Sequence, residues 1–321
     1  MSAETVFHKK LRLMGNRFQL SVVGSDENWA YDCIDSGITE IQRIEKLLTT
    51  FNEESETALI NRNAGLNPVC VSRETFDIIE RSIRISRITQ GAFDITYGSV
   101  DKSLWNFDVN MNSLPDTATA KKMTRLINYR NIELNKTNFS VRLKEKGMRI
   151  GFGGIGKGYA AERAKLVMKE KGARSGIVNA SGDMTTWGIQ PNGDPWTIGI
   201  ADPDSKSQVF SYMNITDMAV ATSGNYEKFI VVNGRKYSHT INPKTGLPVT
   251  GIKSVTIFSP NAEIADAMAT PVMIMGISAG LDMVNQIKNL EAIAIDDNNK
   301  IYTTKNIHFK SIQYEKSYNT H

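Results

Sequence analysis

The order of strand-like and helix-like segments is the feature of this sequence that most constrains its fold. Residues 10–24 alternate apolar and polar side chains, which predicts a strand pair or hairpin. A helical pattern follows over about 28–50, and a second begins after Ser72, a suitable N-cap. The remaining segments show no regular strand–helix alternation. This order predicts an α+β fold, in which mixed sheets pack against helices, rather than a doubly wound parallel sheet.

The second half of the chain contributes most of the further strands and helices. We expect a hairpin over residues 131–143, a helix over 159–171 and two helices between 262 and 290. Strands are expected at residues 175–181, 196–202, 228–241 and 253–259, and a last hairpin turns at 296–300. Small and polar residues predict loops at 106–119, 179–183 and 221–227.

Composition excludes several classes of protein. The chain has 321 residues, 40% of them hydrophobic and 22% charged, which is typical of a globular protein. Its net charge is +4, and the basic residues are mixed with acidic ones, so we expect no nucleic-acid partner. No apolar run approaches the roughly 20 residues that span a bilayer. The N-terminus has no apolar signal region, so a cytoplasmic location is expected for the chain as it stands. A periplasmic or membrane-anchored location is the alternative if a leader has been removed.

The stretch MRIGFGGIGKGYAAE, residues 148–162, matches two nucleotide-binding patterns. Its glycines fit a dinucleotide-binding turn, and together with Lys157 they fit most of a P-loop. A P-loop requires Ser or Thr after the lysine, to bind Mg²⁺, and this chain has Gly158 there. A dinucleotide fold requires an acidic residue near the end of the next strand, where Asn179 stands. We therefore predict neither a Rossmann nor a P-loop fold.

The same stretch still suits an anion. A glycine-rich turn before a helix exposes backbone N–H groups at the positive end of the helix dipole, and Lys157 adds a full charge. A tight packing turn with a solvated lysine explains the stretch equally well. Asp266 and Thr270 stand four residues apart on a predicted helix, so both can reach one hard cation. Taken alone, that spacing is more often a solvated face, and a lone His239 is more often structural.

Seven segments, taken together and in this order, resemble one family. They are MGNRF, GAFDITYG, GGIGKGYAAE, NASGD, TSGNYE, HTINPKTGLP and ADAMAT, between residues 14 and 276. The chain resembles the ApbE-type FAD:protein FMN transferases. The resemblance implies their α+β flavin transferase fold as a single domain over residues 1–310, in one lobe or in two with the FAD cleft between them. Residues 311–321 would form a C-terminal tail.

The resemblance also implies an activity and a site. The family transfers the FMN moiety of FAD, with Mg²⁺, onto a Ser or Thr hydroxyl of an acceptor protein, often a redox-complex subunit, and releases AMP. It places the metal on the backbone carbonyl of Gly154 and on Asp266 and Thr270, and it makes His239 the general base. The residues that match its flavin contacts are Met14, Phe51, Ala92, Phe93, Asp94, Lys157 and Ile241.

Some positions depart from the family pattern and leave alternatives open. Phe51 stands where many relatives have Tyr, which keeps a ring for stacking. Gly151 and Asn242 stand where Asp is usual, which puts details of FAD binding in doubt. A Mg²⁺-dependent FAD pyrophosphatase that gives FMN and AMP would use the same residues with water as the acceptor. A non-catalytic flavin-binding protein is a further alternative, although it would not need a base such as His239.

Overall fold

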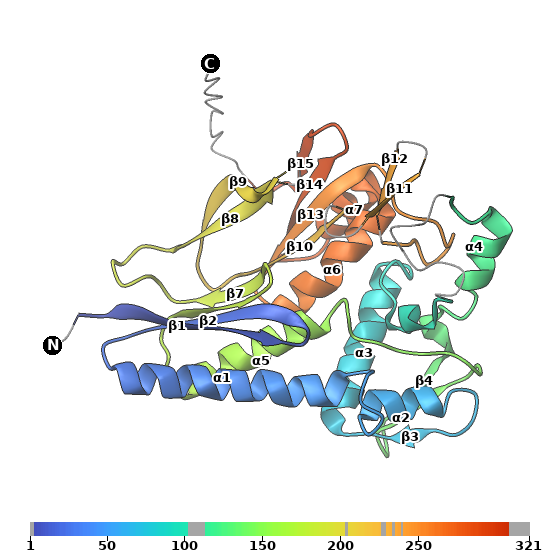
Figure 1. The fold of residues 1–321 in the computed structure, drawn as a ribbon, viewed down its shortest axis with the longest axis horizontal. Helices are drawn as coiled ribbons and strands as arrows, with labels where there is room; N and C mark the ends of the chain where they lie inside the picture. Colours follow the sequence, from blue (N-terminus) through green and yellow to red (C-terminus); the bar gives the residue numbers. More distant parts are fainter. Residues whose placement is uncertain are drawn as a thin grey trace.

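An eight-stranded sheet forms the centre of the molecule (Figure 1). The computed structural model describes residues 3–101, 113–202, 205–225, 229–232, 235–238 and 240–307. Every neighbouring pair of strands in this sheet is antiparallel. The strands, in spatial order, are β1 (Thr5–Leu13), β2 (Asn16–Gly24), β6 (Gly176–Ala180), β7 (Asp183–Trp187), β10 (Ala219–Gly224), β13 (Ile252–Ser259), β14 (Glu291–Asp296) and β15 (Ile301–Thr303).

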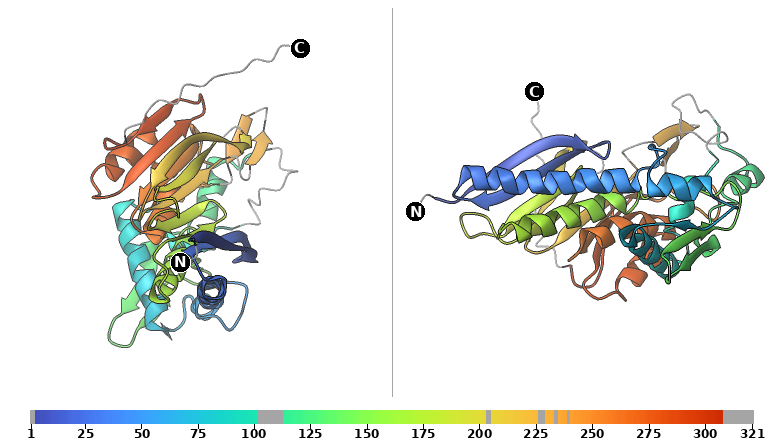
Figure 2. Two further views of the ribbon diagram at one scale, coloured as in Figure 1. Left: turned by 90° about the vertical axis from the view of Figure 1, so that its left-hand side faces the viewer. Right: turned by 90° about the horizontal axis from the view of Figure 1, so that it is seen from below.

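Helices cover one face of this sheet. The helices are α1 (Glu27–Leu48), α5 (Gly156–Glu170), α6 (Ala262–Met275) and α7 (Ile277–Val284). Figure 2 shows α1 and α5 side by side along the sheet. The sequence explains α1 well, because Asp26 caps its first turn and isoleucines at helical spacing, such as Ile34, Ile38 and Ile41, are buried against the sheet. This helical layer carries much of the site described below.

A hairpin packs on the opposite face. It consists of β8 (Trp196–Asp202) and β9 (Ser205–Ile215). A separate apolar cluster fixes it there, in which Trp196, Ile198 and Ile200 meet Val220 and Phe258 of the central strands. Strand alternation places these side chains on one side of the hairpin. We call this side of the large sheet its outer face, and the side covered by helices its inner face.

A smaller group of elements lies beside one end of the sheet (Figure 1). It contains α2 (Glu56–Arg62), α3 (Arg73–Ile88), α4 (Thr117–Met123), the short helices η1 (Ile95–Ser99) and η2 (Tyr129–Asn131), and the strands β3 (Val69–Cys70), β5 (Ser140–Leu143) and β4 (Ile132–Asn135). A further hairpin pairs β11 (Phe229–Val232) with β12 (Arg235–Ser238). The largest buried apolar cluster runs from Leu13 to Ala294 and includes residues of both parts.

The structure agrees with most of the expected elements and corrects some of them. The α+β prediction is confirmed, with sheets whose strand pairs are antiparallel. Residues 221–224 form the end of strand β10, so the loop predicted there is wrong, and α5 begins at Gly156, three residues earlier than expected. The single-domain limits stay a prediction, and the tail at 311–321 lies outside the described residues. None of the helices described is long and apolar enough to cross a membrane.

Candidate functional site

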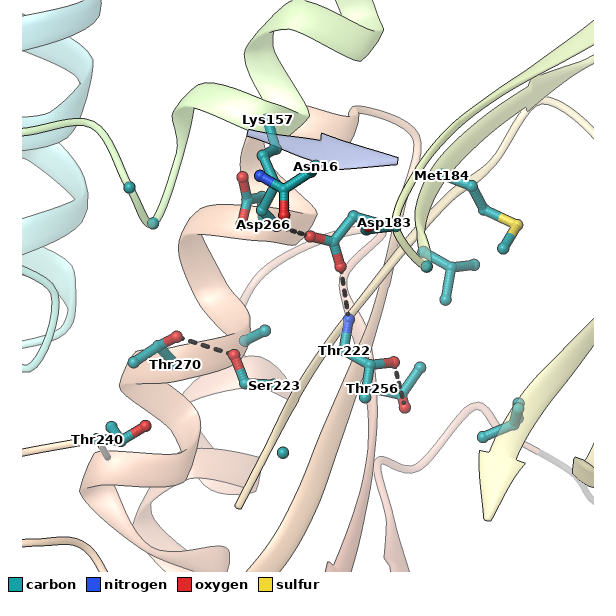
Figure 3. A pocket seen from close by; sticks show the side chains of 18 of the residues that line it. Asn16, Lys157, Asp183, Met184, Thr222, Ser223, Thr240, Thr256, Asp266 and Thr270 are labelled. Atoms are coloured by element: carbon teal, nitrogen blue, oxygen red, sulfur yellow. Dashed lines mark hydrogen bonds and ion pairs between the residues drawn. The ribbon is translucent and has the colours of Figure 1, made fainter. Parts of the chain in front are cut away.

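Two adjoining cavities lie where α5, α6 and the central strands meet. The first, about 440 Å³, is lined mainly by polar and glycine residues, and Figure 3 shows it. The second, about 350 Å³, is lined mainly by apolar side chains. We call them the polar and the apolar compartment. They share the wall residues Gly153, Gly154, Thr240 and Thr270, so they form one cleft with two chemically different ends.

Lys157 joins two carboxylates in the polar compartment. Its ammonium group forms an ion pair with Asp183 at the start of β7 and lies 3.7 Å from Oδ1 of Asp266 on α6. The other oxygen of Asp183 accepts a hydrogen bond of 3.1 Å from the backbone N–H of Thr222 on β10 (Figure 3). Residues from α5, α6 and two strands therefore converge on one point of the cleft.

Asp266 completes the N-terminus of α5 from a neighbouring helix. No side chain at the N-cap position, Ile155, caps α5. Instead, Oδ2 of Asp266 accepts a hydrogen bond of 2.9 Å from the backbone N–H of Gly158, in the first turn. An N-cap side chain normally satisfies such an N–H group. The sequence suggested that N–H groups of this turn bind pyrophosphate, and for Gly158 the structure shows an internal partner.

The environment of Asp266 disfavours its charged form. Burial raises the pKa of Asp266 from 3.8 to about 6, the Lys157 charge and the Gly158 N–H act against this rise, and the nearby Asp183 charge adds to it. A further cation nearby would stabilise the ionised form of such a buried carboxylate. The two carboxylates and one ammonium group leave a net charge of −1, which a divalent ion would turn positive.

Gly158 allows α5 and α6 to touch. A Cβ atom at this position would lie 2.2 Å from the backbone oxygen of Ala262 and 2.7 Å from Cβ of Asp266. Any larger residue would push the two helices apart and separate Lys157 from Asp266. This close approach explains why a glycine follows the lysine where a P-loop carries a hydroxyl.

The predicted metal residues line the same cleft and fit a hard cation. Asp266 and Thr270 lie one turn apart on α6, and Gly154 lines both compartments. The Thr270 hydroxyl is 2.8 Å from the hydroxyl of Ser223 on β10. A carboxylate, a hydroxyl and a backbone carbonyl are all oxygen donors, which Mg²⁺ prefers. The described residues contain no cluster of three His, Cys, Asp or Glu side chains, so a site that depends on such a cluster is not found among them.

The apolar compartment contains several of the predicted flavin contacts. Ala92, Phe93 and Ile241 line it and are almost fully buried. Asp94 also lines it, but its carboxylate accepts hydrogen bonds from the N–H and hydroxyl of Thr96 and from the N–H of Tyr129, at 2.6–2.8 Å. Burial raises the pKa of Asp94. The structure thus shows Asp94 holding the loop around Phe93 in place, and its flavin contact stays a prediction.

Two predicted site residues, Met14 and Phe51, line neither compartment, and a third, His239, cannot be placed relative to them. Met14 lies in the β1–β2 turn, with φ of 50°, and its Cε atom packs near Gly156 at the start of α5. Phe51 is 97% exposed in the loop after α1, beside a separate surface hollow. His239 lies outside the described residues. The flavin contacts of Met14 and Phe51 and the role of His239 therefore stay predictions.

The two departures from the family pattern have different surroundings. Gly151 lines the apolar compartment, and an added Cβ would meet only Thr50, at 3.9 Å, so the position has room for a side chain. Asn242 accepts a hydrogen bond of 2.9 Å from the N–H of Lys244 through its side-chain oxygen. An aspartate would accept the same bond, so Asn242 preserves this turn.

Comparison with known proteins identifies the family. The ApbE family profile matches residues 14–294, most of the chain. The chain belongs to the ApbE family. It is 30% identical to the FAD:protein FMN transferase of Klebsiella pneumoniae, over 94% of this chain and 92% of that protein. It is 28% identical to the enzyme of the same name from Treponema pallidum, over 85% of this chain and 80% of that one.

Solved structures of ApbE proteins share this fold. The crystal structure of the ApbE protein from Thermotoga maritima matches with a TM-score of 0.84 at 28% identity, over 94% of this chain and 97% of that one. The flavin transferase ApbE from Vibrio cholerae matches with a TM-score of 0.80 at 23% identity, over 94% and 97% of the two chains, which supports the fold alone. The predicted family and fold are confirmed.

The structure adds residues to this candidate site that the sequence alone did not reveal. They are Asp183 as the partner of Lys157, Ser223 as the partner of Thr270, and Gly158 as the helix contact. Asp183 and Ser223 belong to the segments NASGD and TSGNYE, which are rich in small residues and end in polar ones. Nothing in the one-dimensional pattern indicated which side chains they would meet.

Proposed function

We propose that this ApbE-family protein transfers the FMN moiety of FAD onto a Ser or Thr hydroxyl of an acceptor protein, with Mg²⁺, and releases AMP. The observation that carries the proposal is that Lys157 and Asp266 lie together in the polar compartment, while Thr270, one turn after Asp266, lines both compartments. The relatives named FAD:protein FMN transferase support it.

The two compartments suit the parts of FAD. The apolar one, with Phe93 and Ile241 in its walls, suits one of the two ring systems, and the polar one has room for the other half. The pyrophosphate between them would then lie at the shared wall, near Gly154. Such a position would leave the scissile phosphoanhydride beside the cationic side chain of Lys157.

Asp266, Thr270 and the carbonyl of Gly154 would hold the metal. Bound there, Mg²⁺ would neutralise charge on the phosphoanhydride oxygens. Lys157 adds a second positive charge and is held in place by Asp183. These fixed charges favour the transition state, in which negative charge builds up on the phosphate oxygens.

His239 is our candidate for the general base. A Thr or Ser hydroxyl is a poor nucleophile at neutral pH, so a side chain must remove its proton during the attack. The family resemblance supports His239, and the next two residues, Thr240 and Ile241, line the cleft. Imidazole has a suitable ordinary pKa, near 6.5.

The test is to incubate the purified protein with FAD, MgCl₂ and a candidate acceptor domain. Transfer predicts a mass gain on the acceptor equal to FMN less water, together with an equal amount of AMP. Release of free FMN and AMP without a labelled acceptor would favour the pyrophosphatase alternative. FAD that stays intact would favour a binding protein. An Asp266→Asn variant, assayed in parallel, controls for contaminating activity.

A further inference from the structure

A basic face lies beside the polar compartment, on the β1–β2 hairpin. Lys10 and Arg12 of β1 and Arg17 of β2 are all exposed, and the strand register places the three side chains on the outer face of the sheet. We call these three residues the basic hairpin face. They line a surface hollow of about 610 Å³.

Two of these side chains oppose each other directly. Arg12 and Arg17 are cross-strand partners in the β1–β2 register. Like charges in directly opposed positions destabilise a sheet. None of the ion pairs found within the described parts of the chain includes Arg12, Arg17 or Lys10. Among the described residues, no carboxylate therefore offsets the repulsion between Arg12 and Arg17, and an anionic ligand would reduce it.

The basic hairpin face is continuous with the candidate active site. Its hollow and the polar compartment share two wall residues, Asn16 and Ser181. Ser181 belongs to the β6–β7 turn, and Asp183, two residues later, pairs with Lys157. An extended segment that lies on this face could thus reach the polar compartment.

Protection of a sheet edge does not explain all three charges. β1 is the terminal strand of the large sheet, and charged residues on such an edge commonly block aggregation. This account suits Lys10 and Arg12. It does not suit Arg17, because β2 pairs with β1 on one side and with β6 on the other. The free edge of β1 would itself allow an extended peptide to pair with it.

FAD also leaves these charges without a partner. Its only strongly anionic group is the pyrophosphate, which the proposed function assigns to the region of Lys157 and Gly154. The basic hairpin face adjoins the polar compartment through Asn16 and Ser181, so its charges suit a second anionic ligand beside the FAD site. Transfer to a protein requires a segment of the acceptor to reach the polar compartment.

We propose that the basic hairpin face docks an acidic segment of the acceptor protein and so brings a neighbouring Ser or Thr hydroxyl to the polar compartment. This inference rests on the proposed function, because it names the chemistry of the acceptor for the same site. Carboxylates of the acceptor pair with Lys10, Arg12 and Arg17. Electrostatic contacts of this kind favour rapid and selective association.

The experiment uses two short fluorescein-labelled peptides and the full chain. One peptide has Asp residues on both sides of a single Thr, and its twin has Asn in place of each Asp. Fluorescence anisotropy measures their binding to the wild type, to a Lys10→Glu/Arg12→Glu/Arg17→Glu variant, and to a control variant. The control, Arg87→Glu/Arg125→Glu/Arg130→Glu, reverses three exposed charges on the smaller part of the molecule.

We expect the wild type and the control variant to bind the Asp peptide about tenfold or more tightly than the hairpin variant does, a difference of about 1.4 kcal/mol. The Asn peptide should bind weakly to all three proteins, and FAD affinity by titration calorimetry should stay unchanged. Equal binding of the two peptides, or equal losses in both variants, would overturn the proposal. The proposal would also be overturned if the wild type did not bind the Asp peptide but bound phosphatidylglycerol vesicles through this face.

A separate readout distinguishes this proposal from the proposed function. Mass spectrometry of the Asp peptide, with FAD and MgCl₂ present, reports FMN transfer, and anisotropy reports docking. Docking without transfer to any acceptor would reject the proposed function and leave the basic hairpin face as a peptide site. Transfer with the same KM for the acceptor in wild type and hairpin variant would reject the docking surface alone.

Discussion

Asp266 shows how a single carboxylate can serve the fold and the site together. One of its oxygens accepts a hydrogen bond from the N–H of Gly158 and so caps α5. The other oxygen lies 3.7 Å from the ammonium group of Lys157. The sequence predicted that Asp266 and Thr270 share one helix face, because residues four apart always do. It could not predict the bond to Gly158, which joins residues 108 positions apart in the chain.

The pH dependence of stability should report the burial of Asp266. Its pKa in the fold, about 6, exceeds the ordinary value of 3.8, so its protonated form stabilises the metal-free protein. This contribution is complete below pH 3.8 and is lost as the pH rises through about 6. Calorimetric melts should therefore show the Tm of the wild type falling, relative to that of Asp266→Asn, between these pH values. Addition of MgCl₂ at neutral pH should raise the Tm of the wild type and leave that of Asp266→Asn unchanged. A Tm difference that is independent of pH would contradict the assignment.

His239 is the side chain to which the proposed function assigns removal of the acceptor's hydroxyl proton. If it is the general base, His239→Asn should slow FMN transfer by roughly 10²–10⁴-fold, the usual contribution of a positioned acid–base group. Protonation of the base slows the wild-type reaction at low pH, so the variant should also lose the acid limb of the pH–rate profile. FAD and Mg²⁺ should still bind, as titration calorimetry can show. Weakened FAD binding with an unchanged pH profile would instead make His239 a cofactor contact and would direct attention to Asp183 as the base.

At the scale of elements, the sequence predicted helices better than strands. The long amphipathic helices α1 and α3 follow from their apolar spacing and their N-caps, Asp26 and Ser72. The small and polar residues at 221–227 predict a loop, but residues 221–224 belong to strand β10. In the structure β10 lies between β7 and β13 and close beside α6, so its strand conformation comes from tertiary pairing rather than from local preference.

The contact between α5 and α6 provides a test at this scale. Gly158→Ala should destabilise the protein by about 1–3 kcal/mol, because the new Cβ would overlap the backbone of Ala262. It should also weaken Mg²⁺ binding, since Asp266 would move. Gly156→Ala is the matched control, two residues away in the same helix, where a Cβ would meet its nearest neighbour at 3.4 Å. Urea denaturation gives the free energy of unfolding of both variants. Equal values would show that the helices do not meet through Gly158.

At the scale of the whole molecule, the cleft is built from segments that are far apart in the chain. Asn16, Lys157, Asp183 and Asp266 all line the polar compartment. The family resemblance indicated which segments belong together, and the structure brings most of them to one place. The resemblance could not give the distances between these segments, because the distances depend on how the sheet and helices pack. For the same reason it could not give the exposed position of Phe51 beside a separate hollow.

The joined compartments predict a preference for FAD over its two halves. FMN can fill only one compartment and lacks the phosphoanhydride, so it gives up the contacts of the other compartment and part of the charge pairing at Lys157. With MgCl₂ present, titration calorimetry should give at least about tenfold tighter binding of FAD than of FMN, or about 1.4 kcal/mol. AMP should bind together with FMN, because the two would occupy different ends of the cleft. Removal of the metal with EDTA should reduce the difference in affinity between FAD and FMN, since the ion would bind at the pyrophosphate. Equal affinities for FAD and FMN, or competition between FMN and AMP, would show that the two compartments do not hold one extended ligand.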